Sequence, residues 1–200
     1  MDLNGKNICI FGASSPATPK RLCDEAFRFG QLAAKHGAAI VCGAGRAGIM
    51  RAVSDGALEA RGTVVGVIPQ FMVDKGWAYP ALSETIVTPD MHSRKLKMAQ
   101  LAHAIVAMPG GVGTLEELLE AITWRQLSIS CHPIVLLNVD NYFEPLIGML
   151  DTAIDNHLMA PDNRRLWHVA SSADEAIDFL VSYNKTNHVL LPTNTDYASQ

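Results

Sequence analysis

Short runs of apolar residues alternate along the chain with segments in which apolar residues recur every three or four positions. The continuous runs are typical of strands buried on both faces, and the periodic segments have the spacing of amphipathic helices. The pattern predicts strands at residues 7–11, 38–42, 63–68, 84–87, 104–107, 133–138 and 166–170. It predicts helices at residues 19–36, 49–60, 90–101, 115–127, 143–157 and 172–183, with an irregular segment at 71–83.

Strands and helices alternate throughout, which indicates an α/β fold: a doubly wound, Rossmann-like parallel sheet with helices on both faces. The pattern contains no internal repeat and no linker, so we expect a single domain at residues 1–183. Residues 184–200 are polar and are expected to form a C-terminal tail. In such folds ligands bind outside the carboxyl ends of the strands, where the sequence has turns rich in glycine or serine at residues 12–15, 43–48, 89–94 and 109–114.

The most informative of these turns lies in residues 108–117, MPGGVGTLEE, which read as strand end, glycine-rich turn and helix start. Glycines allow a close approach of backbone to ligand, and a helix N-terminus has unpaired N–H groups that attract anions. We therefore expect Gly110, Gly111, Gly113 and Thr114 to bind a phosphate. A carboxylate repels phosphate, so Glu117 is better explained as a group aimed at another part of the same ligand, such as the ribose or base of a nucleotide.

Composition narrows the function classes. The 200 residues carry a formal net charge of −4, which argues against a broad nucleic-acid-binding surface. No apolar run approaches the roughly 20 residues needed to span a membrane, and the N-terminus lacks a signal-peptide pattern, so we expect a cytoplasmic protein. The four cysteines form no C-x-x-C pair and no cluster has metal-ligand spacing, so we expect reduced thiols and no metal.

Two motifs together resemble a known family. Residues 109–117 match the PGGxGTxxE signature of the LOG ("lonely guy") proteins, which are cytokinin riboside 5′-monophosphate phosphoribohydrolases, and residues 91–95, MHSRK, resemble the family's Met-His-x-Arg-Lys stretch. The resemblance implies hydrolysis of the N-glycosidic bond of an adenine nucleoside 5′-monophosphate, such as a cytokinin riboside 5′-monophosphate or AMP. It also implies no cofactor and a homodimer or larger homo-oligomer. Relatives have been called lysine decarboxylases, and the sequence offers no basis for that chemistry.

The resemblance assigns roles to particular residues. Glu117 and Arg94 are the expected catalytic residues, with Glu117 stabilising an oxocarbenium-like transition state and activating water. The expected nucleotide-binding residues, besides those of the glycine-rich turn, are Ser14, Ser15, Gly43, Gly45, Met91 and Lys95. Structural roles stay open for several of them: a helix-dipole contact for Glu117, an N-cap for Thr114, packing for Met91 and a solvated position for Lys95.

The chain departs from the family in the turn after its second strand. Gly43-Ala44-Gly45 replaces a triple glycine, and Arg46 stands where a small residue is usual. Both changes are expected to lie near the nucleotide, where they would affect the choice of ligand. The alternative to an enzyme is a non-catalytic nucleotide or cofactor-binding protein, like the molybdenum-cofactor carriers. A dinucleotide-dependent oxidoreductase is disfavoured because the G-x-G-x-x-G of residues 43–48 follows the second strand and no acidic residue ends the next one.

Overall fold

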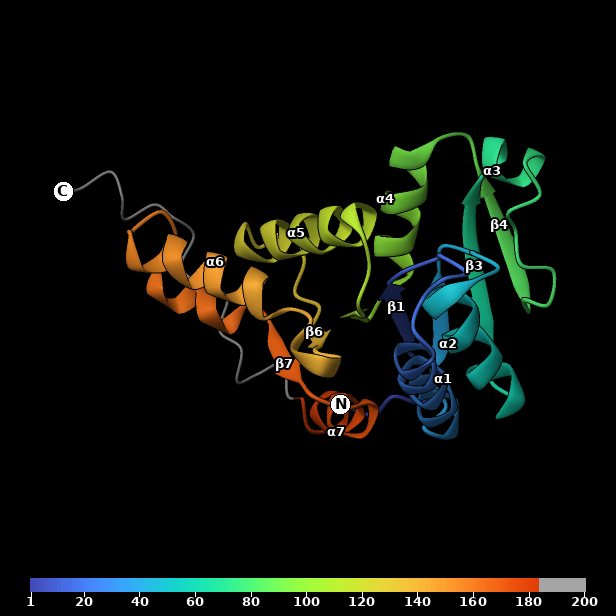
Figure 1. The fold of residues 1–200 in the computed structure, drawn as a ribbon, viewed down its shortest axis with the longest axis horizontal. Coiled ribbons are helices and arrows are strands. Elements are labelled where there is room, and N and C mark those ends of the chain that lie inside the picture. Colours follow the sequence, from blue (N-terminus) through green and yellow to red (C-terminus); the bar gives the residue numbers. More distant parts are fainter. Residues whose placement is uncertain (184–200) are drawn as a thin grey trace.

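Seven parallel strands form one sheet in the computed structural model, which describes residues 1–183 (Figure 1). The tail predicted at residues 184–200 lies outside the described residues. The strands, in the spatial order β4-β3-β2-β1-β5-β6-β7, are β1 (Asn7–Phe11), β2 (Ala39–Cys42), β3 (Val64–Pro69), β4 (Glu84–Thr88), β5 (Ala104–Ala107), β6 (Ile134–Leu137) and β7 (His168–Ala170). The α/β fold with a parallel sheet is confirmed.

Helices cover both faces of this sheet. The α-helices are α1 (Lys20–Lys35), α2 (Gly48–Glu59), α3 (Gln70–Asp74), α4 (Met91–Leu101), α5 (Val112–Gln126), α6 (Glu144–Asp155) and α7 (Ala173–Ser182), and two short 3₁₀ helices are η1 (Val139–Asn141) and η2 (Pro161–Arg165). Figure 1 shows α1, α2 and α7 on one side of the sheet and α5 and α6 on the other.

Strand β1 illustrates why the buried strands are continuously apolar. Its residues Ile8 and Ile10 belong to the core shared with α1, α2 and α7. Its residues Cys9 and Phe11 point to the opposite core, which includes residues of α4, α5 and α6. Because successive side chains enter different cores, polar residues have no place on either face.

The order of the strands locates the site. The chain builds β1 to β4 outward in one direction and then returns to place β5 on the other side of β1. In open α/β sheets the ligand crevice lies at this reversal, at the carboxyl ends of the strands. Here the ends of β1 and β5 are tied together, since Met108 N donates to Phe11 O at 2.8 Å and Ala13 N donates to Pro109 O at 3.1 Å.

Two of the α-helices differ clearly from the sequence prediction. Helix α5 begins at Val112, three residues before the predicted start, and its N-cap is Gly111. A short helix, α3, covers Gln70–Asp74 and so forms the start of the segment predicted to be irregular. Asp90 caps α4 through its side chain, which accepts a hydrogen bond from Ser93 N at 2.7 Å.

All four cysteines lie in the described part and are free thiols. Among residues 1–183, no group of three or more His, Cys, Asp or Glu side chains could hold a metal ion. No helix of this part is long and apolar enough to cross a membrane.

Candidate active site

The glycine-rich turn after β5 presents the N-terminus of α5 at the carboxyl edge of the sheet. The first hydrogen bond of this helix runs from Leu115 N to Gly111 O at 3.1 Å. The N–H groups of Gly111, Val112, Gly113 and Thr114 therefore have no partner within the helix. Residues 111–113 are exposed, and an added Cβ at Gly111 or Gly113 would meet nothing within 4 Å. The predicted anion site thus has unpaired donors and open space in front of them.

Gly110 and Thr114 form the buried floor of this turn. A Cβ at Gly110 would collide with the Thr114 hydroxyl and would lie 2.9 Å from Ala13 N. Thr114 is only 5% exposed and lies inside α5, so it does not cap the helix. Gly110 is therefore required for close packing of the turn against β1 and α5.

Arg94 and Glu117, the two residues expected to be catalytic, come together. Arg94 projects from the first turns of α4 and Glu117 from α5, with Arg94 Nη2 and Glu117 Oε1 3.5 Å apart. Each side chain is only 12% exposed. A pair this far from water is held at greater electrostatic cost than a surface ion pair, which is typical of functional sites.

A glycine makes room for this arginine. A Cβ at Gly43, in the turn after β2, would collide with the Arg94 guanidinium. On its other edge, Arg94 Nη1 lies 3.6 Å from Met91 Sδ. The buried Arg94 Nε has no hydrogen-bond partner among the described residues. A buried donor without a partner needs an explanation, and an oxygen of a bound ligand would supply one.

Burial raises the pKa of Glu117 to about 7. The Arg94 guanidinium acts against this effect and lowers the pKa, as does Lys95, whereas Glu116 and Glu120 raise it. Glu117 is thus a carboxyl group that changes its charge near neutral pH. Such a group is suited to proton transfer at physiological pH.

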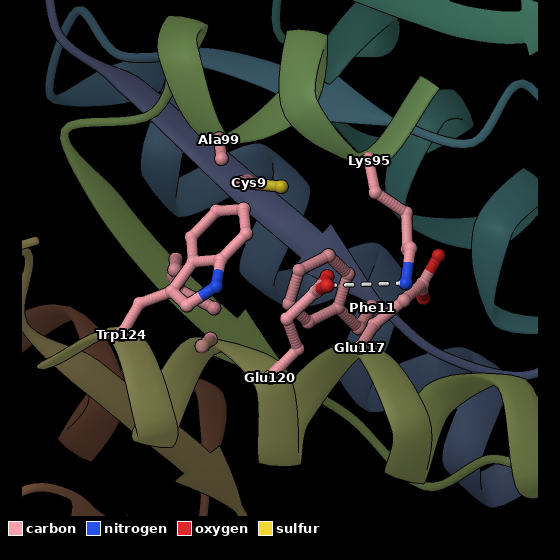
Figure 2. Close-up of a pocket in the computed structure, with 9 residues that line it drawn as sticks. Cys9, Phe11, Lys95, Ala99, Glu117, Glu120 and Trp124 are labelled. Carbon is pink, nitrogen blue, oxygen red and sulfur yellow. Dashed lines mark hydrogen bonds and ion pairs between the residues drawn. The ribbon is translucent and has the colours of Figure 1, made fainter. Parts of the chain in front are cut away.

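Lys95 is largely buried, in contrast to the solvated position that was the structural alternative for it. Its side chain is 14% exposed, and its ammonium contacts Glu116 Oε1 and lies 3.2 Å from Glu120 Oε1. Figure 2 shows Lys95 reaching from α4 to α5, where it meets Glu120 beside Glu117. Lys95 therefore holds the two carboxylates that flank Glu117 along the helix, and its ammonium is directed to them.

A small cavity of about 20 Å³ lies beside these groups, between α4, α5 and β1 (Figure 2). Its lining includes Cys9, Lys95, Glu117, Glu120 and Trp124. Burial raises the pKa of the Cys9 thiol well above its usual value, with a further contribution from Glu117, so the thiol stays neutral. The Glu117 carboxylate thus lies beside a cavity whose surface is mostly apolar, and the Arg94 guanidinium is 3.5 Å from it.

The turn after β2 does not place Ala44 where the sequence led us to expect it. Ala44 has a positive φ of 57° and is fully buried, and its Cβ lies 2.7 Å from the position that a Cβ on Gly66 would occupy. Its methyl group is therefore directed into the protein toward β3. Arg46 is exposed, and a Cβ at Gly45 would lie 3.2 Å from Ser14 Cβ.

Ser14, Ser15 and Met91 lie around the same edge, and all three are exposed. Ser15 Oγ accepts a hydrogen bond from Ala17 N at 3.2 Å, so this serine shapes its own turn. Ser14 makes a close approach to the turn after β2 through the space left by Gly45. The turns after β1 and β2 therefore lie against each other, and the turn after β1 is also bonded to the glycine-rich turn through Ala13 N and Pro109 O.

One residue at this edge was missed by the sequence reasoning. Tyr142, in the loop after β6, donates its hydroxyl proton to Gly110 O in the glycine-rich turn. The signal was present, because residues 139–141, VDN, follow a predicted buried strand and contain turn-forming residues. Ligands bind at the carboxyl ends of the strands, so the turn after this strand belongs with the four turns singled out in the sequence, and Tyr142 lies in it.

Comparison with known proteins gives consistent results. A family profile described as "Possible lysine decarboxylase" matches residues 50–180. The cytokinin riboside 5′-monophosphate phosphoribohydrolase LOG5 of Arabidopsis thaliana is 38% identical over 182 residues, covering 91% of this chain and 80% of that protein. The probable phosphoribohydrolase LOGL6 of Oryza sativa subsp. japonica is 34% identical over 187 residues, covering 94% and 75%.

Solved structures with the same fold include cofactor-binding proteins. The molybdenum cofactor carrier protein of Chlamydomonas reinhardtii superposes with a TM-score of 0.68 at 26% identity, covering 88% of this chain and 96% of that chain. The similarity covers most of both chains, so the fold alone does not distinguish a carrier from a hydrolase. The distinction has to come from the side chains at the site.

Proposed function

We propose that this chain, which belongs to the LOG family of phosphoribohydrolases, hydrolyses the N-glycosidic bond of a cytokinin riboside 5′-monophosphate or of AMP. The products are the free base and ribose 5-phosphate. The observation that carries this proposal is the buried Arg94–Glu117 pair, 3.5 Å apart, beside a helix N-terminus with free N–H groups.

Each group has a chemical task in this reaction. The N-terminus of α5 binds the 5′-phosphate, which places the ribose toward Glu117. As the bond from C1′ to the base nitrogen lengthens, positive charge develops on the ribose, and the Glu117 carboxylate stabilises it. Water attacks C1′ and gives a proton to Glu117, while the base leaves with the bonding electron pair and takes up a proton from solvent. Glu117 then returns its proton to solvent, which restores the carboxylate. The free Arg94 Nε is available to a ribose or phosphate oxygen.

A carrier is the second candidate, because the solved neighbours include a molybdenum cofactor carrier. A carrier needs the anion site but gains nothing from a buried carboxylate next to it. Desolvation of Glu117 is unfavourable for the charged form, and such a cost is expected where chemistry uses the group. We therefore favour the hydrolase.

The assembly we propose is a homodimer or larger homo-oligomer that uses the groove between α4 and α5. The groove has a volume of about 220 Å³, and its lining includes Leu96, Trp124 and Ile129. Leu96 and Ile129 are 52% and 68% exposed. Four lining residues are shared with the cavity beside Glu117, so a second copy in this groove would lie next to the site.

The direct test is to incubate the purified protein with AMP and with isopentenyl-AMP and to follow free base and ribose 5-phosphate by chromatography. We expect base release, and we expect Glu117→Gln to lower kcat by at least about 100-fold, because a neutral amide cannot stabilise the cation. The rates for the two nucleotides identify the preferred base.

A matched control is Glu59→Gln, which changes an exposed glutamate of α2, on the opposite face of the sheet. It should leave kcat within about twofold. Base release by Glu117→Gln at the wild-type rate would remove Glu117 from the mechanism. Tight binding of the nucleotides without release of base would favour the carrier.

A further inference from the structure

The loop after β6 reaches the glycine-rich turn from the side opposite β1. Asp140 and Asn141 both have positive φ values, 53° and 59°, a conformation that few residue types other than glycine adopt readily. The side chain of Asn138, which is 6% exposed, accepts a hydrogen bond from Phe143 N at 2.6 Å and donates one to Glu144 at 2.8 Å. These bonds hold the loop in a defined shape, and Tyr142 lies within it.

Two successive carbonyl groups of the glycine-rich turn are fixed by its two neighbours. Pro109 O accepts the N–H of Ala13, from the turn after β1, at 3.1 Å. Gly110 O accepts the hydroxyl of Tyr142, from the loop after β6. The Tyr142 ring is itself held, because it packs edge-on against buried Phe143 with the ring centroids 5.1 Å apart.

The peptide group between Gly110 and Gly111 has few other constraints on its orientation. Glycine on both sides allows this unit to rotate as a whole, so that its carbonyl and its N–H exchange directions. In a planar trans peptide the carbonyl and the N–H point in opposite directions. When Gly110 O points to Tyr142, the Gly111 N–H must point away from it, and Gly111 is the first of the four unpaired donors of α5. After rotation, a carbonyl oxygen would face the anion instead.

We propose that Tyr142 is a positioning residue for the anion site: its hydroxyl holds the Gly110–Gly111 peptide in the orientation that presents an N–H to the 5′-phosphate. This inference rests on the proposed function, because the anion is taken to be the phosphate of a nucleotide or of ribose 5-phosphate. Tyr142 touches neither the ribose nor the base in this proposal. Its effect is therefore on affinity for the phosphate and not on the chemical step.

The test is Tyr142→Phe, which removes the hydroxyl and keeps the ring that packs on Phe143. Loss of one hydrogen bond of about 1 kcal/mol corresponds to about a fivefold change in affinity. We expect the Kd for ribose 5-phosphate, measured by calorimetry, and the KM for AMP to rise by about 5- to 10-fold. We expect kcat to stay within about twofold and the Kd for adenosine, which has no phosphate, to be unchanged.

Thr152→Val is the matched control, since the Thr152 hydroxyl donates to a glycine carbonyl, Gly148 O, at 2.8 Å in α6. It should leave every one of these constants unchanged. The proposal is overturned if Tyr142→Phe binds ribose 5-phosphate as tightly as the wild type, if kcat falls as much as affinity, or if the wild type does not bind ribose 5-phosphate. Wild-type binding of ribose 5-phosphate that Tyr142→Phe weakens, without base release from any nucleotide, would contradict the hydrolase and support the role of Tyr142.

Discussion

At the scale of single residues, the site is a small network of charges that is unevenly exposed to water. Glu117 and Arg94 are each 12% exposed, whereas Glu116 is 53% exposed. Water screens Glu116 but barely reaches Glu117, and burial raises the pKa of Glu117 to about 7. Glu116 and Glu117 look alike in the sequence, but the packing of α4 against α5 buries only Glu117 and so gives it a different electrostatic environment.

Lys95 adjusts this network, which gives a prediction about pH. Glu117 acts as a carboxylate in the proposed reaction, so kcat/KM of the wild type should rise with pH through about 7. Lys95→Met removes a cation that lowers the pKa of Glu117 and leaves Glu116 and Glu120 unpaired, and both of these raise it. The rise in kcat/KM should move to higher pH, with a loss of roughly 3- to 10-fold at pH 7 and recovery at pH 9.

Two further variants complete this experiment. Lys95→Arg keeps the positive charge and should keep the wild-type pH profile. Lys20→Met removes a lysine from an exposed pair with Asp24 on α1 and should change nothing. An unchanged profile for Lys95→Met, or a loss of activity that is equal at pH 7 and pH 9, would show that Lys95 does not act through the charge of Glu117.

At the scale of elements, the pattern of apolar residues predicted the strands and the long helices, and the family resemblance assigned Arg94 and Glu117 to one site. The apolar runs and the local motifs carry that information, because parallel strands end at one edge and the motifs follow those ends. The start of α5 could not be predicted, since glycines disfavour helix and the helix begins at Val112 where contacts with other loops fix the turn. The direction of the Ala44 methyl group depends on a positive φ that the sequence does not reveal.

Gly43, in the turn after β2, contacts the side chain of Arg94 from α4, and this contact gives a testable prediction. A Cβ there would collide with the guanidinium that α4 places on the turn after β2. Gly43→Ala should displace Arg94 from Glu117 and lower kcat/KM by at least about 10-fold, with the fold retained, as judged by circular dichroism. Gly148→Ala in α6, where a Cβ meets nothing within 4 Å, is the control and should be fully active. Wild-type activity of Gly43→Ala would mean that the position of Arg94 does not matter.

At the scale of the whole molecule, the groove between α4 and α5 predicts self-association. We expect the protein to sediment as a dimer or larger species at micromolar concentration. The double substitution Leu96→Asp and Ile129→Asp should shift it toward monomer, because burying two carboxylates at an apolar contact is unfavourable. Met149→Asp changes another exposed apolar residue, on α6, and should leave the assembly intact. A wild-type protein that sediments as a monomer with full activity would refute this assembly.

The buried Glu117 also links the activity of the protein to its thermodynamic stability. Its pKa is about 7 in the folded protein and close to 4.5 when exposed, so the folded state holds a proton that the unfolded chain has lost between these two values. The contribution of Glu117 to the free energy of unfolding should therefore fall as pH rises from about 4.5 to 7, by about 3 kcal/mol at roughly 1.4 kcal/mol per pH unit, and then level off. Over this same range the carboxylate needed for hydrolysis appears. The same loss of a proton that makes Glu117 competent for hydrolysis thus removes its stabilising contribution, and Glu117→Gln should lose both the activity and this part of the pH dependence of stability.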